Sequence, residues 1–302
     1  NQLGMGDLYK YKIRSNSVLP AFRHIIPEDI TVEPLVTRLL DNVGSDFCPL
    51  SLVSEMLASI ANAIVRKYNN IRVLKKTVAL SVVNKKVTLS SGETIDGLHV
   101  ISTIGGHQIM PDTYKHLKNT ILSTSVLESC PDFSGKRVAV IGASHSAWSV
   151  VWTMVLQYRQ PFREIKMLSR HKTRVFFRTT SEADIEGYDY TEDDICPETR
   201  QIHRFGGLRG DAKQTWRNQK NGIYPHVHHH ISDVIPDVST FDIVVIAFNY
   251  QRREIPGDGS YIKYGMMSGM QLECGEASFK SSKDGIWLYS NDLAKQITEK
   301  II

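Results

Sequence analysis

The sequence has few cysteines, and none of them are paired at redox or zinc-binding spacing. Only four occur among 302 residues, and no CxxC is present. This pattern argues against a dithiol active site and against a cysteine-rich zinc site. We expect buried, reduced thiols at all four positions, Cys48, Cys130, Cys196 and Cys274.

The sequence also lacks a long apolar run and a strong charge of either sign. No segment reaches the ~20 apolar residues of a transmembrane helix, and the start shows no signal-peptide pattern. The 36 Lys and Arg residues barely outnumber the 32 Asp and Glu residues, and no basic tract concentrates the net charge of +4. We therefore expect a cytoplasmic protein without a nucleic-acid or membrane partner, and leave homo-oligomerisation open.

The first third of the sequence predicts one helix followed by a small β-meander. Apolar residues recur every four positions from Leu52 to Ile64, so we expect an amphipathic helix over 51–67, which Ser51 can cap and Pro49 can precede. The stretch IRVLKKTVALSVVNKKVTLSSGETIDGLHVISTIGG then contains short β runs broken at NKK and SSGE. We expect an antiparallel meander that leads into a buried strand at 99–104.

A strand, a helix and a second strand follow from residue 137 onward. The apolar run RVAVI at 137–141 predicts a strand, a helix is expected over about 146–158, and IKMLSR predicts the next strand. This order is typical of a βαβ unit in a parallel sheet. We expect an irregular polar insert over 179–237, of functional or partly disordered character, before the apolar strand in FDIVVIAFNY.

The turn GASHSA, between the first of these strands and its helix, predicts a dinucleotide phosphate site. Such a turn needs a glycine, a small second residue and a small third residue, and Gly142, Ser144 and Ala147 fill these places. The helix N-terminus would present amides and its positive dipole end to an anion, with His145 and Ser146 also in the turn. A plain strand-to-helix turn could carry the same residues, so both interpretations stay open.

The end of the following strand predicts NADPH rather than NADH. A carboxylate at this position would bind a ribose 2′-hydroxyl, whereas the sequence offers Ser169, Arg170, His171 and Lys172. We expect Ser169, Arg170 and Lys172 to bind a 2′-phosphate. The alternative is an ordinary solvated loop.

Four passages in order resemble a known class of proteins. They are VTLSSGETIDGLHVISTIGGHQIMP, PDFSGKRVAVIGASHSA, FDIVVIAFNYQRREIP and GIWLYSNDLAKQI. Together they resemble the two-dinucleotide-binding flavoproteins, which include flavin-containing monooxygenases and the N-hydroxylating lysine and ornithine monooxygenases. The resemblance implies FAD contacts at Gly105, Gly106, Asn291 and Asp292.

The fold implied by this resemblance is α/β, with two Rossmann-like dinucleotide-binding domains. The NADPH domain, 126–264 with its insert, would be inserted into an FAD domain made of 1–125 and 265–302. We expect the N-terminal βαβ unit of that FAD domain to be missing from this sequence, because no GxGxxG follows a strand near the start. Either the sequence omits this unit or the protein has lost FAD; we favour omission, because the meander would otherwise have little to pack on.

Three departures from the class pattern bear on the cofactor sites. Asn291 stands where glycine is usual, Phe248 and Asn249 replace Thr-Gly in the second ATG-like strand, and Ser144 replaces the second glycine of the turn. The FxGxxxH pattern of flavin-containing monooxygenases is also not evident before Phe133. The missing FxGxxxH pattern disfavours a standard flavin-containing monooxygenase and leaves an N-hydroxylating or unassigned relative.

The resemblance implies an FAD- and NADPH-dependent oxidoreductase, most closely a monooxygenase that hydroxylates a small molecule. Because the sequence has no CxxC, the disulfide reductases of this flavoprotein class are disfavoured. No residue can be assigned as a catalytic acid or base. The alternative is a non-catalytic nucleotide-binding or scaffolding protein with a degenerate flavoprotein fold.

Two further motifs have weaker interpretations. In YPHVHHHIS, alternate histidines of a strand could bind a metal, but no nearby carboxylate or cysteine completes a site, so we predict none. A polar loop or strand edge at His226–His230 that lines the cofactor cleft is the preferred interpretation. RSNS, at 14–17, resembles a segment near the flavin in the same class of proteins. The alternative interpretation is an ordinary loop.

Overall fold

The structure is a computed structural model that describes part of the 302-residue chain: residues 12–16, 26–34, 36–37, 48–129, 131–197, 199–204, 206–234 and 236–263. Their contacts divide the chain into two units. The first draws on 1–73, 110–176 and 207–249, and the second on 74–109, 177–206 and 250–302. The domain boundaries expected from the sequence stay a prediction.

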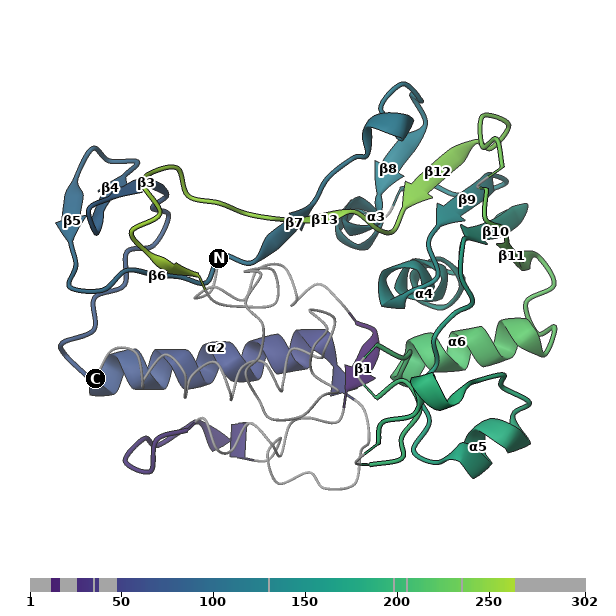
Figure 1. Cartoon of the computed structure of the whole chain (residues 1–302), viewed down its shortest axis with the longest axis horizontal. Helices are drawn as coiled ribbons and strands as arrows, with labels where there is room; N and C mark the ends of the chain where they lie inside the picture. Colours follow the sequence, from purple (N-terminus) through teal and green to yellow (C-terminus); the bar gives the residue numbers. More distant parts are fainter. Residues whose placement is uncertain are drawn as a thin grey trace. The chain divides into compact units, whose positions relative to one another are not determined.

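A five-stranded parallel sheet forms the centre of the first unit, in the order β11-β10-β9-β12-β8 (Figure 1). Its strands are β8 Thr120–Leu122, β9 Arg137–Ile141, β10 Glu164–Ser169, β11 Val227–Ile231 and β12 Ile243–Ile246. The strands predicted in RVAVI, IKMLSR and FDIVVIAFNY are confirmed. The chain moves outward from β9 to β11 and then returns to the other side of β9. Ligands of open parallel sheets bind at such a reversal, beyond the carboxyl ends of the strands.

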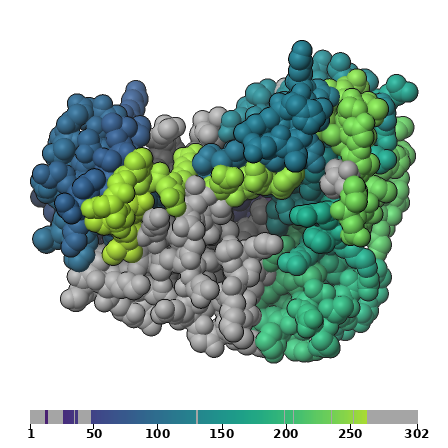
Figure 2. All heavy atoms as spheres, turned by 45° about the horizontal axis from the view of Figure 1, so that its top comes forward, coloured from purple at the N-terminus to yellow at the C-terminus, as the bar shows by residue number. Residues whose placement is uncertain are grey.

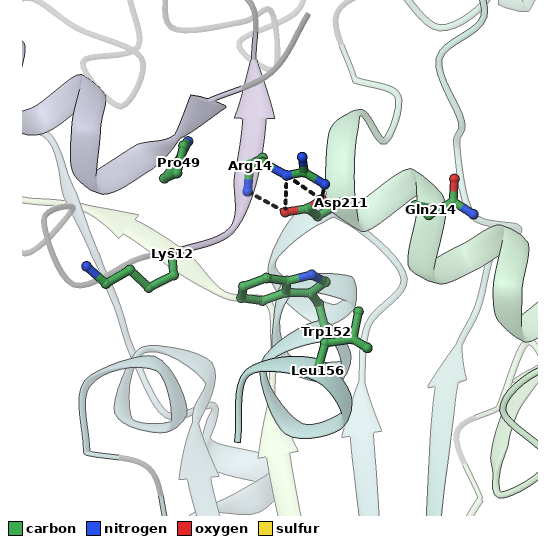
Figure 3. Close-up of a pocket in the computed structure, with 7 residues that line it drawn as sticks. All are labelled: Lys12, Arg14, Pro49, Trp152, Leu156, Asp211 and Gln214. Atoms are coloured by element: carbon green, nitrogen blue, oxygen red, sulfur yellow. Dashed lines mark hydrogen bonds and ion pairs between the residues drawn. The ribbon is translucent and has the colours of Figure 1, made fainter. Parts of the chain in front are cut away.

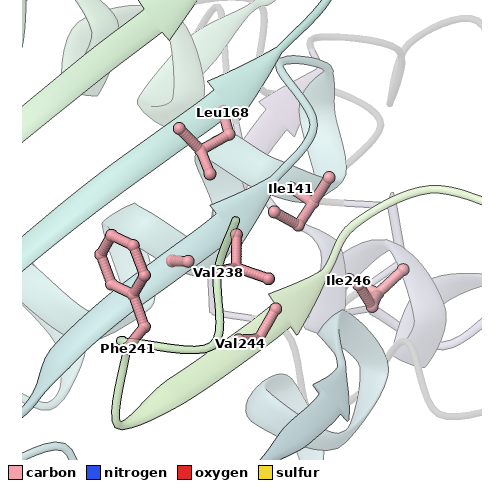
Figure 4. Close-up of a cluster of buried hydrophobic side chains, with 7 residues drawn as sticks. Ile141, Leu168, Val238, Phe241, Val244 and Ile246 are labelled. Atoms are coloured by element: carbon pink, nitrogen blue, oxygen red, sulfur yellow. The ribbon is translucent and has the colours of Figure 1, made fainter. Parts of the chain in front are cut away.

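Strand β12 and the 138–141 part of β9 are apolar, as expected for central strands of a parallel sheet that is covered on both faces. On one face, side chains from β9, β10, β12 and the loop before β12 form a buried cluster (Figure 4). Its members are Ala139, Ile141, Leu168, Val238, Phe241, Val244 and Ile246. This packing fixes the ends of β9 and β12, which carry the candidate site.

Three helices and two short helical turns accompany the sheet. They are α3 Ser123–Ser129, α4 His145–Trp152, α6 Gly210–Lys220, the 3₁₀ turn Asp112–Tyr114 and the π-helical turn Thr153–Gln157. The helix expected over about 146–158 is therefore confirmed, with a widened last turn. Trp148 and Val151 of α4 are fully buried.

The amphipathic helix expected over 51–67 is also confirmed, as α2 Leu50–Lys67. Its apolar face joins a buried cluster with Val36 and Cys48, which includes Met56 and Ile60. The expected cap was wrong, because Pro49 precedes the helix and Ser51 lies buried in its first turn. Before α2, β1 Arg14–Asn16 pairs antiparallel with β2 Cys48–Pro49.

The second unit contains the predicted antiparallel meander and several short elements. The meander is β3 Ala79–Val83, β4 Lys86–Leu89 and β5 Thr94–Asp96. The other elements are β6 Ile101–Ser102, β7 Gly106–Gln108, β13 Tyr250–Arg252, β14 Ile262–Lys263, α5 Thr180–Ile185 and the 3₁₀ turn Glu192–Asp194. Figure 2 shows the blue meander and the yellow-green end of the described chain side by side, where Asp258 accepts the amide of Asn84 at 2.7 Å.

Two expectations for these regions need correction. The strand predicted over 99–104 is short and not buried, because only β6 pairs, with β14, and Ile101 and Ile104 are exposed. The insert over 179–237 is not irregular, since it contains α5, α6 and β11. β11 pairs with β10, so the last part of the polar segment belongs to the central sheet.

The cysteine prediction is confirmed where the structure describes it. Cys48 and Cys196 are buried and form no disulfide bond, whereas Cys130 and Cys274 lie outside the described residues. No helix in the described part of the chain is both long and apolar enough to cross a membrane.

Candidate functional site

The predicted phosphate turn lies at the point where the strand order of the sheet reverses. Gly142 has φ +132°, a conformation that residues with a Cβ rarely adopt. A Cβ at this position would also meet the end of β12, at 3.3 Å from the carbonyl oxygen of Ala247 and 3.5 Å from its Cβ. Both the backbone angle and the close approach therefore require glycine here.

The other residues of the turn begin α4. Ser144 is the exposed N-cap and makes no side-chain capping bond, while Ala147 is buried against the sheet. The first amides of a helix have no acceptor within the helix and point out of its N-terminus. With a small, exposed residue at Ser144, an anion can approach these amides.

His145 joins the turn to the segment that precedes α6. Its Nε2 lies 3.1 Å from the carbonyl oxygen of Gly207, so this nitrogen carries the proton. Burial lowers the pKa of His145 below its ordinary value, the Gly207 hydrogen bond opposes the change, and the Arg209 cation adds to it. His145 is therefore neutral at pH 7 and braces the turn without adding positive charge.

The loop after β10 lies directly beside this turn. The amide of Gly142 donates to the carbonyl oxygen of Leu168 at 2.8 Å, so the ends of β9 and β10 are adjacent. Arg170 and Lys172 are exposed in that loop, whereas Ser169 is buried. The structure thus brings the two predicted cations next to the glycine turn.

Ser169 makes two contacts within the protein, and its predicted role in binding a 2′-phosphate stays a prediction. Its hydroxyl donates to the carbonyl oxygen of His171 at 2.8 Å and lies 2.8 Å from Nε2 of His229. Both contacts are internal to the protein. Ser169 therefore stabilises the loop through its contacts with His171 and His229.

The histidine cluster lies on β11, the edge strand of the sheet, and just before it. His228 and His230 are exposed, and His229 between them points to the opposite face, where it is partly buried. Burial lowers the pKa of His229, and His230 adds to the effect. Among the described residues, no three His, Cys, Asp or Glu side chains are grouped so as to hold a metal ion.

Parts of the two ATG-like passages, β7 of the first and β13 of the second, pair antiparallel in the second unit. Gly106 of β7 pairs with Arg252 of β13, and the carbonyl oxygen of Gly105 accepts the amide of Arg253 at 3.0 Å. Gly105 has φ +65°, with open space where a Cβ would be. Asn249, which replaces a glycine of the class pattern, has φ +64°, a conformation that asparagine tolerates better than most residues.

A hollow of about 300 Å³ lies in the first unit where β1 meets α6 (Figure 3). Asp211 accepts the amide of Arg14 at 2.7 Å and two guanidinium nitrogens at 3.0 and 2.8 Å. Figure 3 shows Trp152 facing this ion pair, with the remaining lining residues around it, Lys12, Pro49, Leu156 and Gln214. The pair links the N-terminal segment to α6, the helix that follows the Gly207 segment contacted by His145.

Several parts of the site were not foreseen from the sequence. Ala247, Gly207 and Arg209 border the glycine turn, and His229 supports the cationic loop. Their positions depend on strand pairing and helix packing between distant segments, which no local motif encodes. The predicted FAD residues Asn291 and Asp292 lie outside the described residues.

Comparisons with known proteins place this geometry in a wider context. No family model matches the chain. The curated CMP-5′-(3-aminopropyl)phosphonate hydroxylase of Streptomyces rubellomurinus is 23% identical, over 99% of this chain and 88% of the relative.

Two solved structures cover most of the chain. The ornithine N-hydroxylase of Kutzneria sp. 744 matches with a TM-score of 0.55 at 12% identity, over 88% of this chain and 80% of the other. Ornithine hydroxylase from Pseudomonas aeruginosa matches with a TM-score of 0.53 at 11% identity, with the same coverage. The α/β fold of two-dinucleotide-binding flavoproteins, predicted from the sequence, is thereby confirmed.

Proposed function

We propose that the protein is an FAD- and NADPH-dependent monooxygenase that hydroxylates an amino group of a small molecule. The observation that carries the proposal is the turn at Gly142, held against Ala247 at the reversal of the sheet. Exposed Arg170 and Lys172 lie in the adjacent loop. This is the arrangement that a dinucleotide with a 2′-phosphate requires.

The residues of the turn would hold the pyrophosphate of NADPH. Without a Cβ, Gly142 lets the backbone approach the phosphates, and the first amides of α4 donate to them with the helix dipole behind. Arg170 and Lys172 would hold the 2′-phosphate through charge-assisted hydrogen bonds. Neutral His145 would keep the turn in place through Gly207.

The FAD side of the proposal is supported by the paired ATG-like passages. The left-handed backbone at Gly105 and the pairing of β7 with β13 are compatible with a chain that passes close to a flavin nucleotide. Asn291 and Asp292 would complete that site. The chemistry that the two cofactors supply when bound is transfer of a hydride from NADPH to flavin, then reaction of the reduced flavin with oxygen.

The choice of an amino group as the reacting centre rests on the similar proteins. The solved relatives are named as ornithine hydroxylases, one of them with FADred, NADP⁺ and L-orn in its description. The curated relative is named as the hydroxylase of an aminopropylphosphonate joined to CMP. A terminal amine is the group that these named substrates share.

The visible absorption spectrum of the full-length protein, recorded before and after anaerobic NADPH, tests the proposal. We expect flavin bands that bleach with NADPH faster than with NADH, and oxygen uptake that rises when an amine substrate is added. A protein that stays colourless with added FAD would refute it and favour a nucleotide-binding or scaffolding role.

A further inference from the structure

The cationic loop after β10 is anchored at both ends by buried hydroxyl groups. Ser169 and Thr173 are 8% and 4% exposed, whereas the three residues between them are exposed. The amide of Ser232 donates to the carbonyl oxygen of Ser169 at 3.0 Å, which ties the start of the loop to the end of β11. The backbone that carries the exposed side chains at 170–172 is therefore held in place at both ends.

His229 donates the hydrogen bond at the first anchor. The Ser169 hydroxyl has one proton, and it donates this proton to the carbonyl oxygen of His171 at 2.8 Å. The Nε2 atom of His229, 2.8 Å away, must then be the donor in their contact. His229 is paired with Met167 in the register of β11 and β10, so its ring lies on the face of the sheet that α4 covers.

Trp148 of α4 holds the second anchor. Its indole Nε1 donates to the Thr173 hydroxyl at 3.0 Å, and both residues are buried. The indole also meets the His229 ring edge to face, with ring centroids 6.1 Å apart and planes at 89°. We call Ser169, Thr173, Trp148 and His229 the loop clamp.

The loop clamp connects the two halves of the candidate dinucleotide site. Trp148 lies one turn along α4 from Ser144, whose carbonyl oxygen accepts its amide at 3.1 Å. The helix that begins at the glycine turn thus also supports the cationic loop. The clamp therefore sets the spacing between the turn and the cations.

We infer that His229 and Trp148 are positioning residues for the loop with Arg170 and Lys172, and that they determine the preference for a nucleotide with a 2′-phosphate. The inference rests on the proposed function. Neither side chain needs to touch the nucleotide. Their removal would let the two cations move while the glycine turn keeps its geometry, so affinity for the 2′-phosphate should fall selectively.

Binding of two small probes to the full-length protein tests this inference without turnover. The probes are adenosine 2′,5′-bisphosphate and adenosine 5′-monophosphate, measured by titration calorimetry, and the readout is the ratio of their dissociation constants. The variant His229→Leu removes the donor, and His229→Gln keeps an N–H donor. The matched control is His228→Leu, on the same strand but exposed on the other face.

For His229→Leu we expect the preference for the bisphosphate to fall roughly 3- to 10-fold, the effect of one lost hydrogen bond. Binding of the monophosphate should change by less than about 2-fold. His229→Gln should regain most of the preference, and His228→Leu should keep all of it. Trp148→Phe, which removes the indole donor and reduces the size of the ring, should lower the preference in the same direction and decides the matter if His229→Leu does not fold.

Results that contradict the positioning role differ from results that contradict the proposed function. An unchanged ratio in His229→Leu, or an equal loss for both probes, would overturn the positioning role. A wild-type protein that binds the two probes equally, or binds neither, would instead overturn the NADPH site itself.

Discussion

Replacement of Gly142 by alanine should weaken both the fold and nucleotide binding. The backbone at φ +132° lies where a side chain is strained, at a cost of about 1–3 kcal/mol. The added Cβ would lie 3.3 Å from the carbonyl oxygen of Ala247, so the end of β12 must also give way. We expect a loss of about 2 kcal/mol in unfolding free energy, which corresponds to a fall of roughly 4–8 °C in Tm.

A second glycine of the same β9 region provides the control. Gly135 has φ +68° and open space where a Cβ would be, so Gly135→Ala carries conformational strain without a steric contact. Asparagine tolerates this left-handed conformation, so Gly135→Asn should cost less than about 1 kcal/mol. Gly142→Asn should be at least as damaging as Gly142→Ala.

Thermal unfolding of the four variants and calorimetric titration with NADP⁺ give the two readouts. We expect the Gly142 variants to lose NADP⁺ affinity at least tenfold, because the Cβ fills the space through which the pyrophosphate approaches, and the Gly135 variants to keep it. Equal Tm changes at both glycines, together with unchanged NADP⁺ affinity in Gly142→Ala, would refute the steric argument and the placement of the phosphate site.

Three further predictions concern charge. Arg170→Ala and Lys172→Ala should each weaken NADPH binding roughly tenfold and leave NADH binding unchanged, and the loss should shrink at high salt; equal losses for both nucleotides in a titration would contradict this. Asp211→Ala should lower the free energy of unfolding by about 1–2 kcal/mol in urea denaturation, because three nitrogen atoms of Arg14 lose their acceptor while the Arg14 side chain stays largely exposed. Because the pKa of His145 is lowered in the folded protein, the unfolded chain binds a proton at higher pH, and the free energy of unfolding should fall as pH drops below about 6.5. His145→Gln should flatten this part of a plot of Tm against pH. An unchanged slope would argue against a buried neutral His145.

Local sequence patterns predicted much of the fold correctly. The run RVAVI and the period of four from Leu52 to Ile64 each occur within one element and follow from which faces are buried, so β9 and α2 could be located closely. The phosphate turn was also recognisable, because its glycine and small residues lie within six positions. By contrast, α6 is too polar for its sequence to indicate a helix, and only Ala212 and Trp216 bury apolar surface in it.

The sequence by itself determined which segments could be strands and helices, and which short motif could meet a phosphate. The tertiary structure decided what surrounds that motif. The proximity of Ala247 to Gly142, and of His229 to Ser169, arises from parallel pairing of strands that lie far apart in the chain. A parallel sheet brings its carboxyl ends together at one edge, and the sequence alone does not state the order in which its strands pair.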